Sequence, residues 1–291
     1  MNLSRTTYRS MSDATMFGLQ GALARTQRLQ QELSSGRRVA SPSDDPAAAG
    51  SSMKLRSQRQ ADEQYLRNIE NASGRLNVTD NALQQLNSRL GRVRELAIQS
   101  RDGAIGGESL VSIAAEISSI KTDVIDLYNT RWLNRPVFGG TVQGQDAIDS
   151  SETYIGDDRP IYARISRDGT VQIDTKGTDI HADTVPALLD QLASDIVSNP
   201  TAVQADIDAL DSSMSAILQT LSTVGARAAR VETAKANVDA ERLDFTARIS
   251  ENEDVDLPET IMNLQAQQVA YQAALGAASK VLTTSLVDFL R

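Results

Sequence analysis

The chain has 291 residues, a formal net charge of −9 at pH 7, 40% hydrophobic residues and only 4% aromatic residues. The negative charge argues against a nucleic-acid partner, because phosphate binding needs a basic face. The absence of cysteine excludes disulfides, thiol nucleophiles and cysteine–metal sites. No apolar run reaches the roughly 18 residues of a membrane span, and MNLSRTTYRSM lacks the apolar core of a cleavable signal peptide. We therefore expect no membrane partner, and either a cytosolic protein or one that leaves the cell without such a signal.

The first segment, residues 1–45, predicts a weakly packed helix and then a corner. Its apolar spacing follows the coiled-coil heptad, but small and polar residues fill several positions. The series is Met16, Leu19, Leu23, Thr26, Gln30 and Leu33. Such a helix gains little from burial and either pairs with the other chain end or awaits a partner molecule.

A run of chain-breaking residues, LSSGRRVASPSDDPAAA, follows from Leu33 to Ala49. After Ser34, Gly36 suits the left-handed conformation that ends helices. Asp45 before Pro46 predicts an N-cap, with the proline in the first turn of the next helix. Metal binding by Asp44 and Asp45 is the weaker interpretation, because adjacent carboxylates at a cap rarely converge. We read the run as a fixed corner.

Three longer heptad series predict a helical bundle. The first is Tyr65, Ile69, Ala72, Leu76, Thr79, Leu83, Leu86, Leu90, Val93 and Ala97; the second is Leu110, Ile113, Ile117, Ile120, Val124 and Leu127. The third is Val203, Ile207, Leu210, Met214, Ile217, Leu221, Val224, Ala228, Val231, Val238, Phe245 and Ile249. The glycines of RDGAIGGES allow the first two helices to reverse and pair antiparallel.

The helical period is lost between about Pro136 and Thr184. PIYARIS and TVQIDT alternate as strands do, and the RDG between them predicts a hairpin. PALLDQLASDIVS predicts a short helix over 186–198, begun by proline. A small β or α+β lobe inserted in the helical rod is the simplest interpretation.

The last segment has the heptad period with small and polar substitutions, like the first. Its series is Ile261, Leu264, Gln268, Tyr271, Leu275, Ala278, Leu282, Ser285 and Phe289. The fold class expected is mainly α, an antiparallel coiled-coil bundle of long heptad helices with a small inserted lobe and weakly packed terminal helices. The expected divisions are residues 1–45, 46–135, 136–200, 201–250 and 251–291.

Few residues of the chain are candidates for catalysis. His181 is the only histidine, so a multi-histidine metal site is excluded, and no phosphate-binding glycine loop or nucleophile elbow occurs. Asp157 and Asp158 are carboxylates of the right type for acid–base work but have no recognisable partner. We expect no enzyme activity, no cofactor and no metal; Asp157, Asp158 and His181 are the residues that a test of catalysis would change first.

Two segments carry a family resemblance. LSSGRRVASPSDDPAAA and the C-terminal EDVDLPETIMNLQAQQVAYQAALGAASKVLTTSLVDFLR resemble segments at the same positions in bacterial flagellins and flagellar hook-associated proteins. Within that family, DDPAAA, FGGT, YIGDD, RISRDGTVQID and SLVDFLR are most similar to the hook-associated protein 3 group, the hook–filament junction proteins. TRWLNRPVFGG departs from the family's usual run at that place.

The resemblance implies a structural subunit that stays in the cytoplasm until the flagellar type III channel exports it, and then assembles at the hook–filament junction outside the cell. Its implied partners are other copies of itself, the adjoining hook-associated protein, flagellin, and an export chaperone on the C-terminal region. The implied assembly interface consists of Met16, Leu19, Leu23, Leu33, Leu264, Tyr271, Leu275, Leu282, Leu286 and Phe289.

Two rival functions stay open at this point. A flagellin filament subunit, the nearer rival, is also a structural protein and would polymerise extensively. A cytosolic coiled-coil adaptor or signalling module would instead pair its own termini and stay inside the cell.

Overall fold

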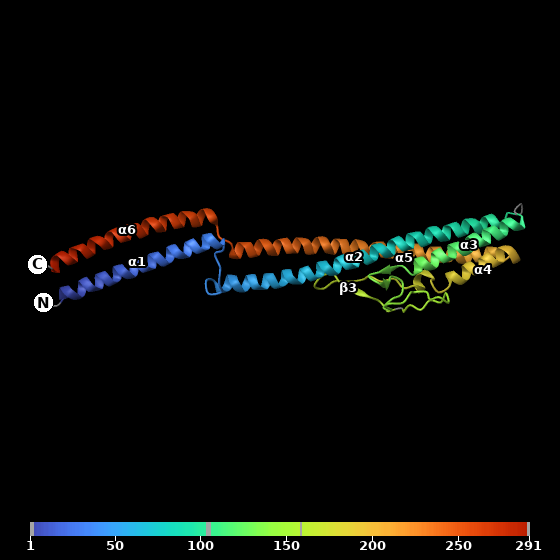
Figure 1. The fold of residues 1–291 in the computed structure, drawn as a ribbon, viewed down its shortest axis with the longest axis horizontal. Helices are drawn as coiled ribbons and strands as arrows, with labels where there is room; N and C mark the ends of the chain where they lie inside the picture. The colour runs from blue at the N-terminus through green and yellow to red at the C-terminus, as the bar shows by residue number, and fades with distance from the viewer. Residues whose placement is uncertain (1–2, 103–105, 158, 290–291) are drawn as a thin grey trace. The chain divides into compact units, whose positions relative to one another are not determined.

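The computed structural model describes the backbone of residues 3–102, 106–157 and 159–289. The side chains of residues 1–9, 11, 12 and 280–291 lie outside the described set, together with those in the backbone gaps. The described chain forms six α-helices (Figure 1): α1 Leu3–Ser35, α2 Pro46–Ser100, α3 Gly107–Tyr128, α4 Val185–Ser198, α5 Val203–Glu253 and α6 Leu257–Phe289. The predicted mainly α fold with a small β portion is confirmed.

The chain divides into two compact units, and both divisions fall inside long helices. The core unit is Ala61–Glu241, and the terminal unit is Met1–Gln60 with Arg242–Arg291. Helices α2 and α5 each contribute to both units.

The three long heptad series build the interior of the core unit, as predicted. On α2 every predicted position from Ile69 to Ala97 is buried. On α3 the predicted positions from Ile113 to Val124 are buried, and α5 buries most of its series from Val203 to Val238. Arg92 pairs with Glu116 at 2.9 Å and Arg89 with Asp123 at 3.5 Å, which shows that α3 runs antiparallel to α2. A continuous 3.5-residue stripe lets each helix bury one narrow face along its length.

Helix α5 also runs antiparallel to α2 within the core unit. Near the end of α2, Arg101 bonds to Gln204, and two turns earlier Arg94 forms a bidentate pair with Asp211, the shorter contact being 2.5 Å. Helix α4 packs along α3 (Figure 1), and Lys121 of α3 reaches Asp190 of α4 at 2.8 Å. The same lysine contacts Glu152 of the insert at 2.9 Å, so one half-buried ammonium joins three segments.

The insert contains two small hairpins. Strands β3 (Tyr162–Arg164) and β4 (Thr170–Gln172) pair antiparallel, which confirms the hairpin predicted around RDG. A 3₁₀ turn follows at Thr178–Ile180, and α4 confirms the helix predicted over 186–198, with Pro186 in its first turn.

The other hairpin was not predicted. Strands β1 (Arg131–Trp132) and β2 (Arg135–Pro136) are joined by Leu133 and Asn134, both at positive φ. This two-residue turn normally selects glycine or asparagine, so leucine at its first position removed the usual signal.

The few aromatic residues fasten the insert to the helices. Tyr128 is fully buried, donates its hydroxyl to the Ile180 carbonyl at 3.0 Å and meets Phe138 edge-on at 6.4 Å. Trp132 donates to Asn71 at 3.0 Å and lies over Gly74, where a Cβ would come within 2.5 Å of the indole. A sequence with only 4% aromatic residues thus concentrates several of them where rod and insert meet.

Candidate assembly site: the terminal helices and their corner

The corner between α1 and α2 is held by its two aspartates. Gly36 has φ +69, the left-handed conformation expected after Ser35, the last residue of α1. Asp45 accepts hydrogen bonds from the amides of Ala47 and Ala48 at 3.1 and 3.0 Å, so it is the N-cap of α2 as predicted.

Asp44, unlike Asp45, forms its hydrogen bonds within the corner loop. Its carboxylate accepts from the Ser41 amide at 2.8 Å and from the Ser41 hydroxyl at 3.0 Å. These bonds lower the pKa of Asp44, because they stabilise its charged form. The two carboxylates therefore bind separate groups, and no cluster of three or more His, Cys, Asp or Glu side chains in the described chain is placed to hold a metal.

A second corner, between α5 and α6, is bonded to the first. The Arg38 amide donates to the Glu253 carbonyl at 2.7 Å, and the Val255 amide donates to the Gly36 carbonyl at 3.1 Å. These bonds flank a one-residue antiparallel bridge between Arg37 and Asp254. Asp256 then caps α6 by accepting from the Glu259 amide at 3.1 Å. The two corners thus form one joint from segments more than two hundred residues apart in sequence.

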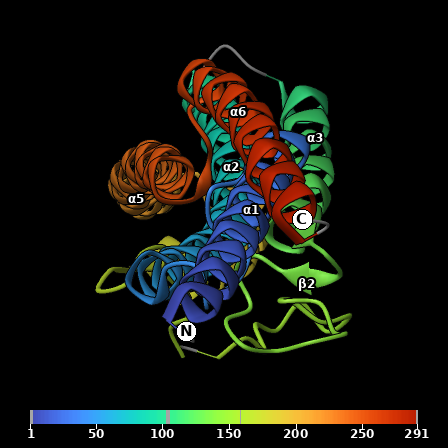
Figure 2. The same ribbon diagram turned by 90° about the vertical axis from the view of Figure 1, so that its left-hand side faces the viewer.

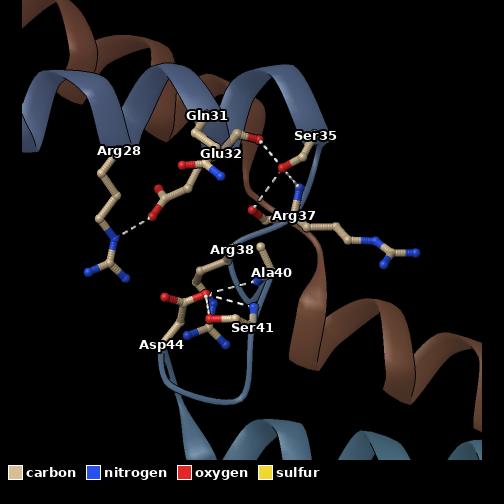
Figure 3. Close-up of a pocket in the computed structure, with 9 residues that line it drawn as sticks. All are labelled: Arg28, Gln31, Glu32, Ser35, Arg37, Arg38, Ala40, Ser41 and Asp44. Carbon is tan, nitrogen blue, oxygen red and sulfur yellow. Dashed lines mark hydrogen bonds and ion pairs between the residues drawn. The ribbon is translucent and has the colours of Figure 1, made fainter.

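A polar hollow of about 180 Å³ lies beside this joint, between the last turns of α1 and the corner loop (Figure 3). Its charges are largely satisfied within the unit: Arg28 pairs with Glu32 at 3.0 Å, and Arg38 donates to the Asn252 carbonyl at 2.8 Å. Asp44, on its wall, is occupied by Ser41. The hollow therefore braces the corner and presents no converging set of catalytic groups.

Helices α1 and α6 pair antiparallel (Figures 1 and 2). The side chains that are fully buried between them are small. Only Ala22, Thr26, Thr260 and Ala278 are buried in the described part of these two helices. The covered positions keep the heptad steps. They are Thr15, Leu19, Ala22, Thr26, Leu29 and Leu33 on α1, with Thr260, Leu264, Gln267, Tyr271, Ala274 and Ala278 on α6. Such a seam removes little apolar surface from water and stabilises the pair weakly.

The pairing of α1 with α6 covers the heptad series of the two chain ends only at alternate positions. The sequence series placed Met16, Leu23 and Gln30 on the same stripe as Leu19, but the structure exposes these three and covers Ala22 and Leu29 instead. On α6 the corresponding exposed residues are Ile261, Gln268 and Leu275. At these positions the pairing covers the neighbouring residue instead, and Ala22 and Ala274 are covered in place of the larger Leu23 and Leu275.

The larger apolar side chains consequently form a second, uncovered stripe. Met16 is 55% exposed, Leu23 40% and Leu275 45%, and Phe17 nearby is 80% exposed. Of the other expected interface residues, Leu19, Leu33, Leu264 and Tyr271 are half-buried in the α1–α6 seam. The side chains of Leu282, Leu286 and Phe289 lie outside the described residues. The terminal helices thus keep an apolar face available beyond their own pairing.

The candidates for catalysis have structural partners instead of a shared site. Asp157 accepts from the Thr141 amide at 2.7 Å and bonds the Thr141 hydroxyl, fixing the FGGT turn. His181, at φ +56, places Nδ1 3.0 Å from the Ser213 hydroxyl, which itself donates to a helix carbonyl. Asp158 lies outside the described residues.

Sequence reasoning missed the residues that join the two corners. Arg38, Glu253 and Val255 take part through their backbones, and backbone bonding leaves no composition signal. Asp256 before Leu257 and Pro258 was a readable signal, because it repeats the aspartate-and-proline start of α2.

Comparison with known proteins places both helical ends in one family. The model of the bacterial flagellin N-terminal helical region matches residues 7–134, and that of the C-terminal helical region matches residues 207–290. A flagellin of Halalkalibacterium halodurans is 27% identical over 255 residues, 85% of each chain. Flagellar hook-associated protein 3 of Escherichia coli K12 is 22% identical and aligns with 95% of this chain and 96% of its own.

Solved structures share the fold. FlgL of Bacillus cereus superposes with a TM-score of 0.61 at 21% identity, covering 68% of this chain and 99% of that one. The flagellar junction protein FlgL of Legionella pneumophila gives a TM-score of 0.56 at 16% identity, covering 70% and 100%. Because the two family models together account for most of the sequence, including the corner and both terminal helices, the chain belongs to the bacterial flagellin family.

Proposed function

We propose that this chain is a structural subunit of the flagellum that joins the hook to the filament. The observation that carries the proposal is the nearly end-to-end alignment with a hook-associated protein 3, which runs through the insert as well as both helical ends. The matched flagellin covers less of this chain, 85% against 95%. The fold shared with the junction protein of Legionella pneumophila supports the same assignment.

The geometry supports assembly through the terminal unit. The α1–α6 seam uses small side chains and leaves Met16, Leu23 and Leu275 exposed to water. Exposed apolar stripes of this kind are stabilised by a neighbouring surface. Other copies of this chain cover the stripe in the assembled junction. An adjoining hook-associated protein contacts the junction on one side, and flagellin contacts it on the other.

The export history is part of the proposal. The subunit stays in the cytoplasm until export, with a chaperone on residues 251–291, and is extracellular at the junction afterwards. None of the helices in the described part of the chain combines the length and apolar character needed to cross a bilayer. The net charge of −9 disfavours nucleic acid as a partner.

No enzymatic role is proposed. Asp157 and His181, the side chains first considered for chemistry, are engaged with Thr141 and Ser213 and do not converge. The hollow beside the corner holds charges that are already paired.

Gene deletion and labelling in the source bacterium test the proposal. A junction role predicts bare hooks, with filament subunits shed into the medium, and antibody to this chain should label one narrow zone where filament meets hook. Labelling along the whole filament would instead identify a flagellin. Recovery of the chain only inside the cell would support a cytosolic adaptor.

Seeded polymerisation of the purified chain separates the two flagellar roles independently. A filament subunit extends seeds into long filaments, whereas a junction subunit should not elongate them. Extension would overturn the junction assignment while leaving family membership intact.

A further inference from the structure

A buried carboxylate closes one end of the helical interior of the core unit. Asp62 lies on the α2 seam three residues before Tyr65, where the heptad asks for an apolar side chain. It is 5% exposed, and its Oδ2 atom has no hydrogen-bond partner. The facing charges are Glu241 of α5 and Arg167 from the turn between β3 and β4.

The opposite end of the same interior carries a matching feature. Asp206, in the first turn of α5, is 4% exposed and also has an Oδ2 atom without a partner. The carboxyl of Asp195 on α4 lies within hydrogen-bonding reach of it. Arg101, which directly follows α2, also reaches this end but bonds Gln204 instead.

Two carboxyl groups in contact can share one proton, but they repel when both are ionised. Burial raises the pKa of Asp206, and the neighbouring Asp195 raises it further. Burial likewise raises the pKa of Asp62, with Glu241 adding to the rise and Arg167 opposing it. Both aspartates therefore hold a proton more readily in the folded chain than in the unfolded chain.

We propose that the core unit is closed at both ends by proton binding, with Asp62 beside Glu241 at one end and Asp206 beside Asp195 at the other. With the protons bound, Asp62 and Asp206 are neutral. The packing between α2 and α5 then continues to both ends of the core unit, because no buried charge interrupts it. With the protons lost, the buried charge of each aspartate faces a second carboxylate, and the end turns open.

The sign of the pH dependence follows from the raised pKa values. The folded chain holds these protons at a pH where the unfolded chain has released them, near the ordinary aspartate value of 3.8. The stabilisation is complete below that pH and is lost as the pH rises through the folded-state values. The device concerns the core unit alone and does not depend on the proposed role in the flagellum.

Hydrogen exchange on the full chain tests this, with the variants Asp62→Asn and Asp206→Asn. The matched controls are Glu63→Gln and Asp208→Asn, exposed acids on the same two helices. Variant and native chains are compared at one pH, so that the intrinsic pH dependence of exchange cancels.

At pH 7.5 we expect Asp62→Asn to slow exchange in the amides of residues 61–66 and 237–241, and Asp206→Asn to slow it in residues 191–210. At pH 3.5 both variants should match the native chain, and the controls should match it at both pH values. Urea midpoints should rise in the two variants at pH 7.5 and coincide with the native midpoint at pH 3.5.

Faster or unchanged exchange at pH 7.5 would overturn the proposal at the end where it is seen. A slowing that persists undiminished at pH 3.5 would also overturn it, since the effect would then come from shape and not from titration.

Discussion

The guanidinium of Arg56 on α2 lies 2.5 Å from the carboxylate of Glu253, the last residue of α5. The Glu253 side chain is 8% exposed, and its backbone carbonyl accepts from Arg38 at the corner. Glu253 therefore contacts α2 through its side chain and the loop before α2 through its backbone carbonyl. The ion pair thus adds a side-chain contact to the backbone bonds of the joint.

Replacing Arg56 with Met should loosen the joint, because the Glu253 carboxylate would stay buried without its partner. We expect a loss of about 1 kcal/mol, moderated by the exposure of the arginine to solvent. Faster amide exchange at Arg38 and Val255 would measure it. Glu251→Gln, an exposed change on the same turn, is the control; equal exchange in both variants would show that the pair contributes nothing.

The N-cap of α2 can be tested at Asp45. Asp45→Ala removes the acceptor for the amides of Ala47 and Ala48 and should cost about 1 kcal/mol. Asp45→Asn keeps an oxygen in place and should recover most of the loss. Circular dichroism during urea unfolding measures both; an unaffected alanine variant would argue against the cap.

Asp157 should show a pH dependence opposite to that of the buried acids of the core unit. Its partial burial works to raise the pKa, but the hydrogen bonds from Thr141 outweigh this and leave the pKa lowered. Its contribution to stability is therefore present above about pH 3.8, the ordinary aspartate value, and lost as the pH falls through the folded-state value.

The variant Asp157→Asn should consequently be less stable than the native chain at pH 7 and should approach it in acid. Thermal unfolding at a series of pH values measures the difference. A constant difference across the series would mean that the carboxylate charge is not involved.

Gly74 on α2 lets Trp132 of the insert lie against the helix. Alanine there would raise helix propensity by about 1 kcal/mol. Its Cβ would also meet the rigid indole at 2.5 Å, an overpacking that costs about 1–3 kcal/mol. We expect a net loss and displacement of β1 from the helix.

Fluorescence reports this directly, since Trp132 is the only tryptophan in the chain. Gly74→Ala should shift its emission toward that of exposed indole. Gly50→Ala, where a Cβ meets nothing within 4 Å, is the matched control and should leave the spectrum unchanged.

The two stripes of α1 make a contrasting pair of variants. Leu23→Ser changes an exposed position and should alter the stability of the isolated chain by less than about 0.5 kcal/mol while impairing assembly. Ala22→Ser changes the buried neighbour, inside the α1–α6 seam, and should affect the isolated chain more. Motility and hook-tip labelling measure assembly; normal assembly of the Leu23 variant would show that the exposed stripe is not the interface.

Much of the architecture followed from local pattern. The positions from Ile69 to Ala97 kept one heptad phase, so the sequence determined both the helix and the face it buries. The cap at Asp45 and the turn at Gly36 were equally readable, because a proline and a left-handed glycine constrain their own backbone.

Other features depended on what packs against a segment. On α1 the Leu23 stripe and the Ala22 stripe differ by one residue, and only the surface of α6 selected the second. The β1–β2 turn lacked a local signal because Leu133 stands at a positive φ, where glycine or asparagine is the usual residue.

The composition, the heptad spacing and the corner motif can be read directly from the sequence. They determined that the chain forms long helices with weakly packed ends, and they carried the family resemblance. The tertiary structure decided which stripe is covered, which backbones join the two corners and where acids are buried without partners. Periodicity is set by the helix geometry of one segment, whereas coverage depends on the distance between two surfaces, and that distance is known only once the chain has folded.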